Sequence, residues 1–208
     1  MRLAILLSGR GSNFRAIHDA IARNELDAEI VLVFSNRPDV AGIATAESLG
    51  LRSEVLDHRT YRTRAGHEAA LLELLEAARP DYIVLAGYMR LLSASFVERY
   101  RQRILNIHPA LLPSFPGVDA QTQAIAHGVK VSGCTVHFVD ESLDGGPIVV
   151  QRAVAVHADD TAETLAGRIL EQEHLAYVEA LQKLAGSWRI DGRRVLFADE
   201  KKAPARLL

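Results

Sequence analysis

Residues 2–23 read RLAILLSGRGSNFRAIHDAIAR, and this stretch decides the fold class. Its first part, the apolar run 2–8, predicts a buried strand. A turn with two glycines follows, and residues 13–23 then predict a helix with apolar side chains at helical spacing, namely Phe14, Ile17 and Ile21. A strand that leads through a glycine turn into a helix is typical of a doubly wound α/β sheet.

The same alternation of short apolar runs with amphipathic stretches continues through the first hundred residues. Further strands are predicted at 29–35, 52–56, 82–86 and 104–108. Further helices are predicted at 40–49, 61–78 and 93–100. Strands and helices that alternate in this way build a parallel sheet with helices on both faces, so we predict an α/β fold.

The pattern changes after residue 108. Residues 109–119 hold three prolines and a glycine, which predicts a long surface or active-site loop. Two β-rich runs, 131–140 and 147–156, predict an antiparallel pair added to the parallel core.

A long helix is predicted next, because Asp160 and Glu163 have the spacing of a capping box. The Asp191-Gly192 step within 188–197 predicts a terminal hairpin, and residues 201–208 are predicted to be frayed. The C-terminal part is therefore an antiparallel addition to the sheet.

Composition is that of an ordinary globular protein. The 208 residues carry 24 Lys+Arg against 26 Asp+Glu, a net charge of −2, and 49% are hydrophobic. This length favours one large domain. The balanced charge argues against nucleic acid as a partner, because a general nucleic-acid binder needs a basic excess.

The sequence shows neither a membrane-spanning run nor a signal peptide. No apolar run reaches the roughly 20 residues of a membrane span, and the apolar start is too short for a signal peptide. The single cysteine, Cys134, cannot form an internal disulfide and is interpreted as a small buried residue. We therefore expect a cytoplasmic protein that does not bind membranes.

The turn 8–13, SGRGSN, is the first candidate site. Backbone N–H groups and the positive end of a helix dipole meet there, so the turn suits a phosphate. It is not a dinucleotide fingerprint, because Phe14 stands where the third glycine of GxGxxG belongs. The alternative is a simple glycine turn in which Ser12 or Asn13 caps the helix.

Asn106 and His108 form the second candidate site, at the end of a predicted central strand. Strand alternation puts both side chains on one side, and ligands of open α/β sheets bind beyond the carboxyl ends of strands. An amide beside an imidazole would stabilise an oxyanion. The alternative is a histidine that only caps the strand.

The loop 140–146, DESLDGG, carries three acids: Asp140, Glu141 and Asp144. Such loops are usually solvated turns. A metal site with His108 or His137 is not favoured, because no metal-ligand spacing accompanies the acids. A carboxylate placed beside His108 would instead favour its protonated form.

Glu173 is the fourth candidate, because it falls on the apolar face of the last long helix. It shares this face with Leu165, Ile169, Ala176 and Ala180. A buried acid requires partners. Vicinal sugar hydroxyls would supply them, and so would an internal arginine or a backbone cap.

Several motifs together resemble the phosphoribosylglycinamide formyltransferase family, folate-dependent enzymes of purine biosynthesis. They are SGRGSN at 8–13, LAGYMRLL at 85–92, NIHPALLPSFPG at 106–117, HFVDESLDGGPI at 137–148 and EQEH at 171–174. The resemblance spans residues 2 to about 185. It implies a Rossmann-like formyltransferase fold over 1–208, with a nucleotide-binding half of about 1–100 and a folate and catalytic half of about 101–208.

The resemblance also implies a reaction, in which the formyl group of 10-formyltetrahydrofolate passes to the amino group of glycinamide ribonucleotide without a metal. Residues implied for the ribonucleotide are Gly11, Ser12, Asn13 and Glu173. Residues implied for the folate are Arg64, Met89, Arg90, Leu91, Leu92, Asn106, Asp140, Glu141 and Asp144. The catalytic residues implied are Asn106, His108 and Asp144. A monomer or weak homodimer that binds these two small molecules is expected.

Two positions depart from the family pattern. Leu170 stands where a polar residue often helps to bind the phosphate, and residues 118–121 lack the histidines often seen there. Two other functions remain open at this point: a 10-formyltetrahydrofolate deformylase, in which water replaces the amine, and a non-catalytic nucleotide sensor.

Overall fold

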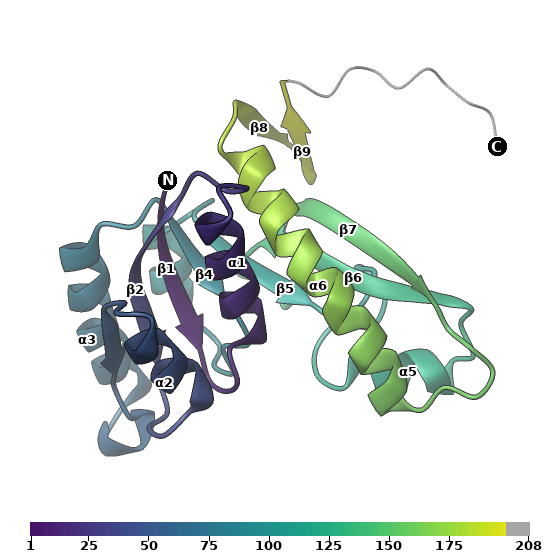
Figure 1. Cartoon of the computed structure of the whole chain (residues 1–208), viewed down its shortest axis with the longest axis horizontal. Helices are drawn as coiled ribbons and strands as arrows, with labels where there is room; N and C mark the ends of the chain where they lie inside the picture. The colour runs from purple at the N-terminus through teal and green to yellow at the C-terminus, as the bar shows by residue number, and fades with distance from the viewer. Residues whose placement is uncertain (199–208) are drawn as a thin grey trace.

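The computed structural model describes residues 1–198, in which nine strands form one sheet of order β3-β2-β1-β4-β5-β6-β7-β9-β8 (Figure 1). The strands are β1 Arg2–Leu7, β2 Glu29–Ser35, β3 Ser53–Val55, β4 Tyr82–Leu85, β5 Ile104–His108, β6 Val131–Phe138, β7 Ile148–Ala155, β8 Trp188–Asp191 and β9 Arg194–Phe197. The helices are α1 Ser12–Ala22, α2 Ala41–Ser48, α3 Arg64–Ala78, α4 Ala94–Arg99, α5 Ala120–Ala126 and α6 Ala162–Leu184, with a 3₁₀ turn at His58–Thr60. The predicted frayed tail, 201–208, lies outside the described residues.

Strand β5 is the centre of the sheet and the place where its direction changes. It pairs in parallel with β4 and antiparallel with β6. The strands on the β4 side, from β3 to β5, are parallel, whereas β6/β7 and β8/β9 are antiparallel pairs. The mainly parallel sheet with an antiparallel C-terminal addition is thus confirmed.

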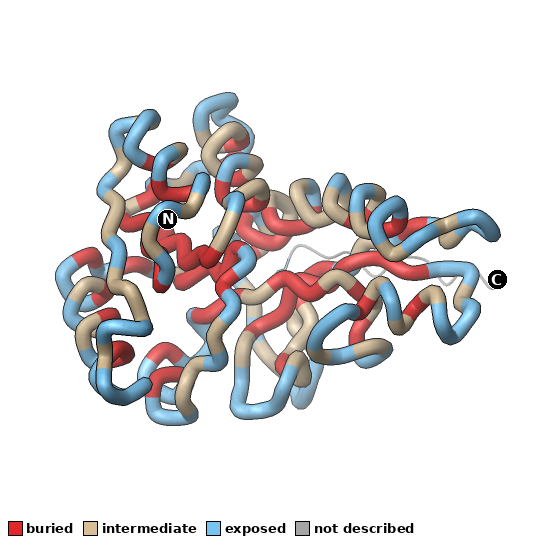
Figure 2. Tube along the Cα trace, turned by 90° about the horizontal axis from the view of Figure 1, so that it is seen from below, coloured by how far each residue is buried: buried red, intermediate tan, exposed pale blue. Residues whose placement is uncertain are grey.

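Helices cover both faces of the sheet, as the alternation predicted. In β1, Leu3, Ile5 and Leu7 pack into one core with α1 and α6, while Ala4 and Leu6 pack into a second core with α3 and α4. Side chains alternate across a strand, so one apolar strand fills both layers. Buried residues accordingly run along the central strands (Figure 2).

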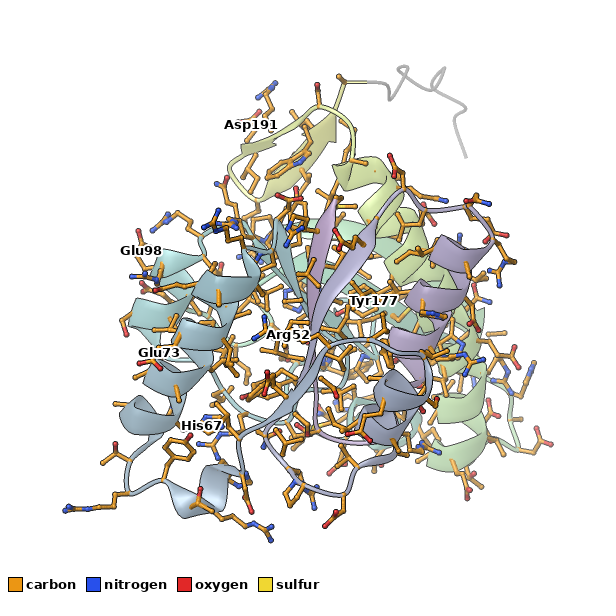
Figure 3. The ribbon with its side chains drawn as sticks, turned by 60° about the vertical axis from the view of Figure 1, so that its left-hand side comes forward. Arg52, His67, Glu73, Glu98, Tyr177 and Asp191 are labelled. Atoms are coloured by element: carbon orange, nitrogen blue, oxygen red, sulfur yellow. The ribbon has the colours of Figure 1, made fainter. Side chains whose placement is uncertain are left out.

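Helix α6 lies beside α1 and also packs on β6 and β7, so it contacts both the parallel and the antiparallel part of the structure (Figure 1). Its Tyr177 is fully buried and donates its hydroxyl to the carbonyl oxygen of Leu85 at 2.6 Å; Figure 3 labels this side chain. Burial raises the pKa of Tyr177 well above its ordinary value, so the phenol stays a neutral donor.

One prediction of local structure is wrong, and one helix was not predicted. The cap of α6 is Thr161, paired with Thr164 in a capping box, whereas Asp160 binds Arg168 at 2.8 Å. The predicted capping partner, Glu163, only contributes negative charge to the first turn. Residues 120–126 form α5, which is not predictable from the sequence because AQTQAIA carries little apolar periodicity.

Among residues 1–198, no helix is long and apolar enough to cross a membrane.

Candidate active site

The carboxyl ends of β1, β4 and β5 lie next to one another, because these strands are parallel neighbours. The turn after β1 and the segment after β4 contact each other there. Ser8 donates its backbone N–H to the carbonyl oxygen of Gly87 at 3.1 Å, and its hydroxyl accepts the N–H of Met89 at 2.8 Å. Two of the predicted substrate-binding segments are therefore joined at the base of the site.

The turn before α1 is held open by Gly11, which has φ 74° and ψ 30°. A Cβ on Gly11 would lie 3.0 Å from Cα of Gly42, so a side chain would crowd the turn. Gly11 is the N-cap residue and makes no side-chain cap, and Ser12 is already the first helical residue. Capping by Ser12 or Asn13, the simple alternative, is wrong, and no side chain among the described residues caps the first N–H groups of α1.

Asn13 and Glu173, two residues predicted for the same substrate, are in contact. Nδ2 of Asn13 donates to Oε2 of Glu173 at 2.8 Å, and Oδ1 of Asn13 is buried without a partner among the described residues. Burial raises the pKa of Glu173, although this hydrogen bond opposes the rise. The internal partner of Glu173 is thus the side-chain amide of Asn13. It is neither of the two alternatives, an arginine or a backbone cap.

Asn106 is oriented by His137, which lies opposite it in the β5/β6 register. Nδ2 of Asn106 lies 3.2 Å from Nε2 of His137, and Nδ1 of His137 lies 2.9 Å from the carbonyl oxygen of Phe138. The contact with the carbonyl oxygen places a proton on Nδ1, and Nε2 then accepts from Asn106, with Oδ1 of Asp144 farther away at 3.8 Å. Burial lowers the pKa of His137, which agrees with a neutral ring.

His108 faces acceptors on both ring nitrogens. Nδ1 lies 3.4 Å from Oδ2 of Asp144, and Nε2 lies 2.7 Å from the carbonyl oxygen of Phe115. Only a protonated imidazole donates from both nitrogens. The 3.4 Å separation is longer than a good hydrogen bond, so the Nδ1–H remains suited to a further acceptor.

Asp144 joins the loop 140–146 to the loop 109–119. Its Oδ2 accepts the backbone N–H of Gly117 at 2.8 Å, and its backbone has φ 50°. The loop folds tightly over the end of β6, because a Cβ on Gly146 would lie 1.8 Å from the carbonyl oxygen of Phe138. The structure therefore brings Asn106, His108 and Asp144 together, as predicted.

The other two acids of this loop lie apart from that group. Asp140 is exposed and accepts the backbone N–H of Ser142 at 2.9 Å. Glu141 is exposed, and its charge acts on Arg101. Their predicted contact with folate stays a prediction.

Large apolar side chains are exposed around the strand ends, which is typical of a surface that a ligand covers. Met89 and Leu91 are 78% and 70% exposed, and Val118 and Leu143 are 83% and 61% exposed. Of the remaining predicted folate residues, Arg90 and Leu92 are partly buried, and Arg64 begins α3.

Cys134 is buried, and burial raises the pKa of its thiol to about 12, so it is no nucleophile. No cluster of three His, Cys, Asp or Glu side chains within the described part of the chain is arranged to hold a metal ion.

Sequence reasoning missed His137 and Phe115 as members of the site. His137 begins the motif HFVDESLDGGPI, but its role depends on the register between β5 and β6, which the motif does not encode. The carbonyl group of Phe115 had no signal in the sequence at all, because any residue carries one.

Comparisons with known proteins identify the family of this chain. The family described as formyl transferase matches residues 1–181. Phosphoribosylglycinamide formyltransferase of Escherichia coli K12 is 39% identical over 93% of this chain and 89% of its own length. The trifunctional purine biosynthetic protein adenosine-3 of Drosophila melanogaster is 48% identical over 88% of this chain, which spans only 14% of that protein.

Solved structures give the same result. The crystal structure of glycinamide ribonucleotide transformylase 1 from Symbiobacterium toebii superposes with a TM-score of 0.93 at 45% identity, covering 96% of this chain and 94% of that one. A formyltetrahydrofolate deformylase from Pseudomonas syringae has a TM-score of 0.87 at 26% identity, over 94% of this chain and 65% of that one.

Proposed function

Because this chain belongs to the formyl transferase family, we propose that it transfers the formyl group of 10-formyltetrahydrofolate to the amino group of glycinamide ribonucleotide. The products are formylglycinamide ribonucleotide and tetrahydrofolate. The observation that carries the proposal is the meeting of Asp144 with His108, the last residue of β5, on the strand that also carries Asn106. We assign the reaction to the cytoplasm and to a monomer or weak homodimer, with no nucleic acid or membrane partner.

The ribonucleotide fits the side of the site between α1 and α6. Its phosphate would accept hydrogen bonds from the backbone N–H groups of Gly11, Ser12 and Asn13. One carboxylate oxygen of Glu173 accepts from Asn13, so the other is left for the ribose hydroxyls. Leu170 offers no hydrogen bond, and therefore the backbone carries more of the phosphate binding.

The folate fits the other side, against the segment after β4. Met89 and Leu91 would cover its apolar faces, and Arg64 would attract the carboxylates of its glutamate. Asn106, Arg90, Leu92 and the loop with Asp140, Glu141 and Asp144 would complete the wall. The formyl group would then lie beside Asn106 and His108, between the two substrates.

The neutral amine attacks the formyl carbon directly, so that a C–N bond forms and the carbonyl oxygen becomes an oxyanion. The side-chain amide of Asn106 donates one N–H to His137 and can donate its second N–H to this oxyanion. His108 donates its Nδ1–H to the same oxyanion. Charge develops there only in the transition state, so these donors lower the barrier selectively.

Asp144 faces Nδ1 of His108 and passes the amine proton onward through water. The bond from the formyl carbon to N10 of the folate then breaks, and N10 takes up a proton. One proton leaves the amine and one reaches N10, so the chain ends each turnover unchanged and forms no covalent intermediate.

Deformylation is the second candidate, because a deformylase shares the fold at lower identity. A single assay separates the two activities: donor consumption is followed at 10-formyltetrahydrofolate excess, with and without glycinamide ribonucleotide. Consumption that depends on the ribonucleotide supports transfer, and equal consumption in its absence indicates hydrolysis. Binding of the ribonucleotide with no consumption in either mixture would indicate a sensor.

A further inference from the structure

Glu68 of α3 is a buried carboxylate next to the proposed folate site. Its side chain is only 10% exposed. It accepts the Nε–H of Arg64 at 2.9 Å and the backbone N–H of Ser93 at 3.0 Å, and the hydroxyl of Ser93 donates to its second oxygen. His67, its neighbour on α3, is labelled in Figure 3 and locates this corner of the molecule.

The donors to Glu68 come from two different elements. Arg64 begins α3, whereas Ser93 ends the segment after β4 and caps α4 by accepting the N–H of Phe96. A buried carboxylate is costly unless it is paired and fully hydrogen-bonded. Here three donors supply that compensation, so loss of the charge would weaken the contacts of Glu68 with Arg64 and Ser93.

The segment 89–93 is consequently held at both ends. The N–H of Met89 binds the hydroxyl of Ser8 at one end, and Ser93 binds Glu68 at the other. Between these anchors Leu91 is 70% exposed, although it is a large apolar residue. A short segment fixed at its ends presents such a side chain in one position, which reduces the entropy lost on ligand binding.

Arg64 is oriented by the same carboxylate. Its Nε–H is used by Glu68, so the N–H groups of its two terminal nitrogens are the ones directed at other acceptors. The side chain is 44% exposed, and it lines a groove of about 530 Å³ between α3 and α4. A carboxylate from solution therefore has access to this guanidinium.

We propose that Glu68 is a positioning residue for the folate donor: it fixes Arg64 toward the glutamate carboxylates of the donor, and it fixes Ser93 at the end of the segment 89–93 that covers the rings of the donor. This inference rests on the proposed function. It goes beyond the family resemblance, which implied Arg64 but not the residue that orients it.

The test compares Glu68→Gln with Glu76→Gln. Gln keeps the shape of Glu68 but removes the charge and turns an N–H donor toward Arg64 or Ser93. Glu76 lies on the same helix and pairs with Arg99 of α4, but its side chain is 53% exposed, so it is a matched control. Both variants are assayed with 10-formyltetrahydrofolate and with 10-formyltetrahydropteroate, which lacks the glutamate.

Glu68→Gln should raise the KM for 10-formyltetrahydrofolate about tenfold, and that for the pteroate donor less than threefold. Its kcat and its KM for the ribonucleotide should stay within twofold of wild type, as should every constant of Glu76→Gln. An unchanged folate KM, or an equal rise for both donors and the ribonucleotide, would overturn the proposal.

Failure of the proposed function would be visible separately. If the wild-type chain forms no product, calorimetric binding of tetrahydrofolate and tetrahydropteroate to both variants tests Glu68 without the reaction, with the same expected ratio. If Glu68→Gln does not fold, Ser93→Ala removes the hydroxyl donor to Glu68 and keeps the pair of Glu68 with Arg64. This variant should raise the KM for 10-formyltetrahydrofolate and the KM for the pteroate donor by about threefold. No change in either KM would count against the proposal.

Discussion

The side-chain amide of Asn106 lies 3.2 Å from Nε2 of His137, across the antiparallel pair of β5 and β6. The imidazole is fixed in turn by the carbonyl oxygen of Phe138 at 2.9 Å. The proposed oxyanion donor is therefore held by a neutral acceptor on the neighbouring strand.

His137→Ala should lower kcat about 10- to 100-fold, because Asn106 loses the acceptor that orients its second N–H. The KM values should change little, since neither substrate is proposed to bind His137. His137→Gln, whose side-chain oxygen accepts the same hydrogen bond, should recover part of the rate. Steady-state kinetics with the exposed His157→Ala as control check this; no difference between Ala and Gln would contradict the positioning role.

Asp144→Asn should lower kcat about 100-fold or more and change ribonucleotide affinity less than threefold. The amide keeps an acceptor for the N–H of Gly117 but removes the negative charge 3.4 Å from His108. The charge that faces Nδ1 of His108 is therefore lost in the variant. Kinetics and ribonucleotide titration on the same protein separate the effects, and equal losses would make the loop chiefly a binding element.

Glu173→Gln should stabilise the unliganded protein while it weakens ribonucleotide binding. Burial raises the pKa of Glu173 in the folded protein, so the protonated side chain stabilises the fold. This stabilisation is fully present below the pKa of the unfolded chain and is lost as pH rises through the folded-state pKa. At pH 7.5 the charge is therefore a cost. Gln also brings a donor toward the unpaired Oδ1 of Asn13.

The expected change for Glu173→Gln is a Tm about 2–4 °C higher, equivalent to about 1 kcal/mol in a domain of this size. The ribonucleotide KM should rise at least tenfold, because a ribose hydroxyl loses a charged acceptor. Thermal scans at pH 7.5 and steady-state kinetics provide both values. A lower Tm would show that the charge is well compensated by Asn13.

Stability should fall as the solution is acidified below about pH 6.5, the ordinary unfolded-state pKa of histidine. Burial lowers the pKa values of His67 and His137 in the folded protein, so the fold favours their neutral rings. The free energy of unfolding is therefore highest above the unfolded-state pKa and falls as pH drops toward the folded-state pKa values. Each contributes at most about 1.4 kcal/mol per pH unit. Urea unfolding at pH 5, 6, 7 and 8 measures the slope.

The matched comparison for this pH effect is His67→Gln against the exposed His157→Gln. The first should flatten the pH dependence, and the second should leave it as in wild type. A slope that is the same in both variants would assign the effect to other groups.

The strands of the parallel half were predictable because each is a short apolar run between turn signals. Strand β5 was predicted at its observed bounds, and its place at the centre of the sheet puts Asn106 and His108 at a carboxyl end. Helix α5 was not predictable in the same way, because its buried residues are alanines that follow a proline-rich loop. Tertiary contact with α6 stabilises it instead.

The contacts that complete the site depend on distances between loops, and periodicity does not encode them. From the residues alone, Asp144 was one of three acids in a turn, and only the family resemblance selected it. The ion pair to His108 requires the backbone of Asp144 at φ 50° and the N–H of Gly117, which lie in different loops. Similarly, the N-cap of α6 is Thr161 and not Asp160, whose carboxylate binds Arg168 instead.

The central claim is that the formyl group passes directly to the amine of glycinamide ribonucleotide. It is tested most directly by single-turnover reaction with 10-formyltetrahydrofolate that is ¹³C-labelled in the formyl group, followed by ¹³C NMR of the small molecules. We predict that the label moves from the donor into the N-formyl group of formylglycinamide ribonucleotide, without accumulation of formate and only when the ribonucleotide is present. Label that appears as formate at the same rate without the ribonucleotide would contradict the account.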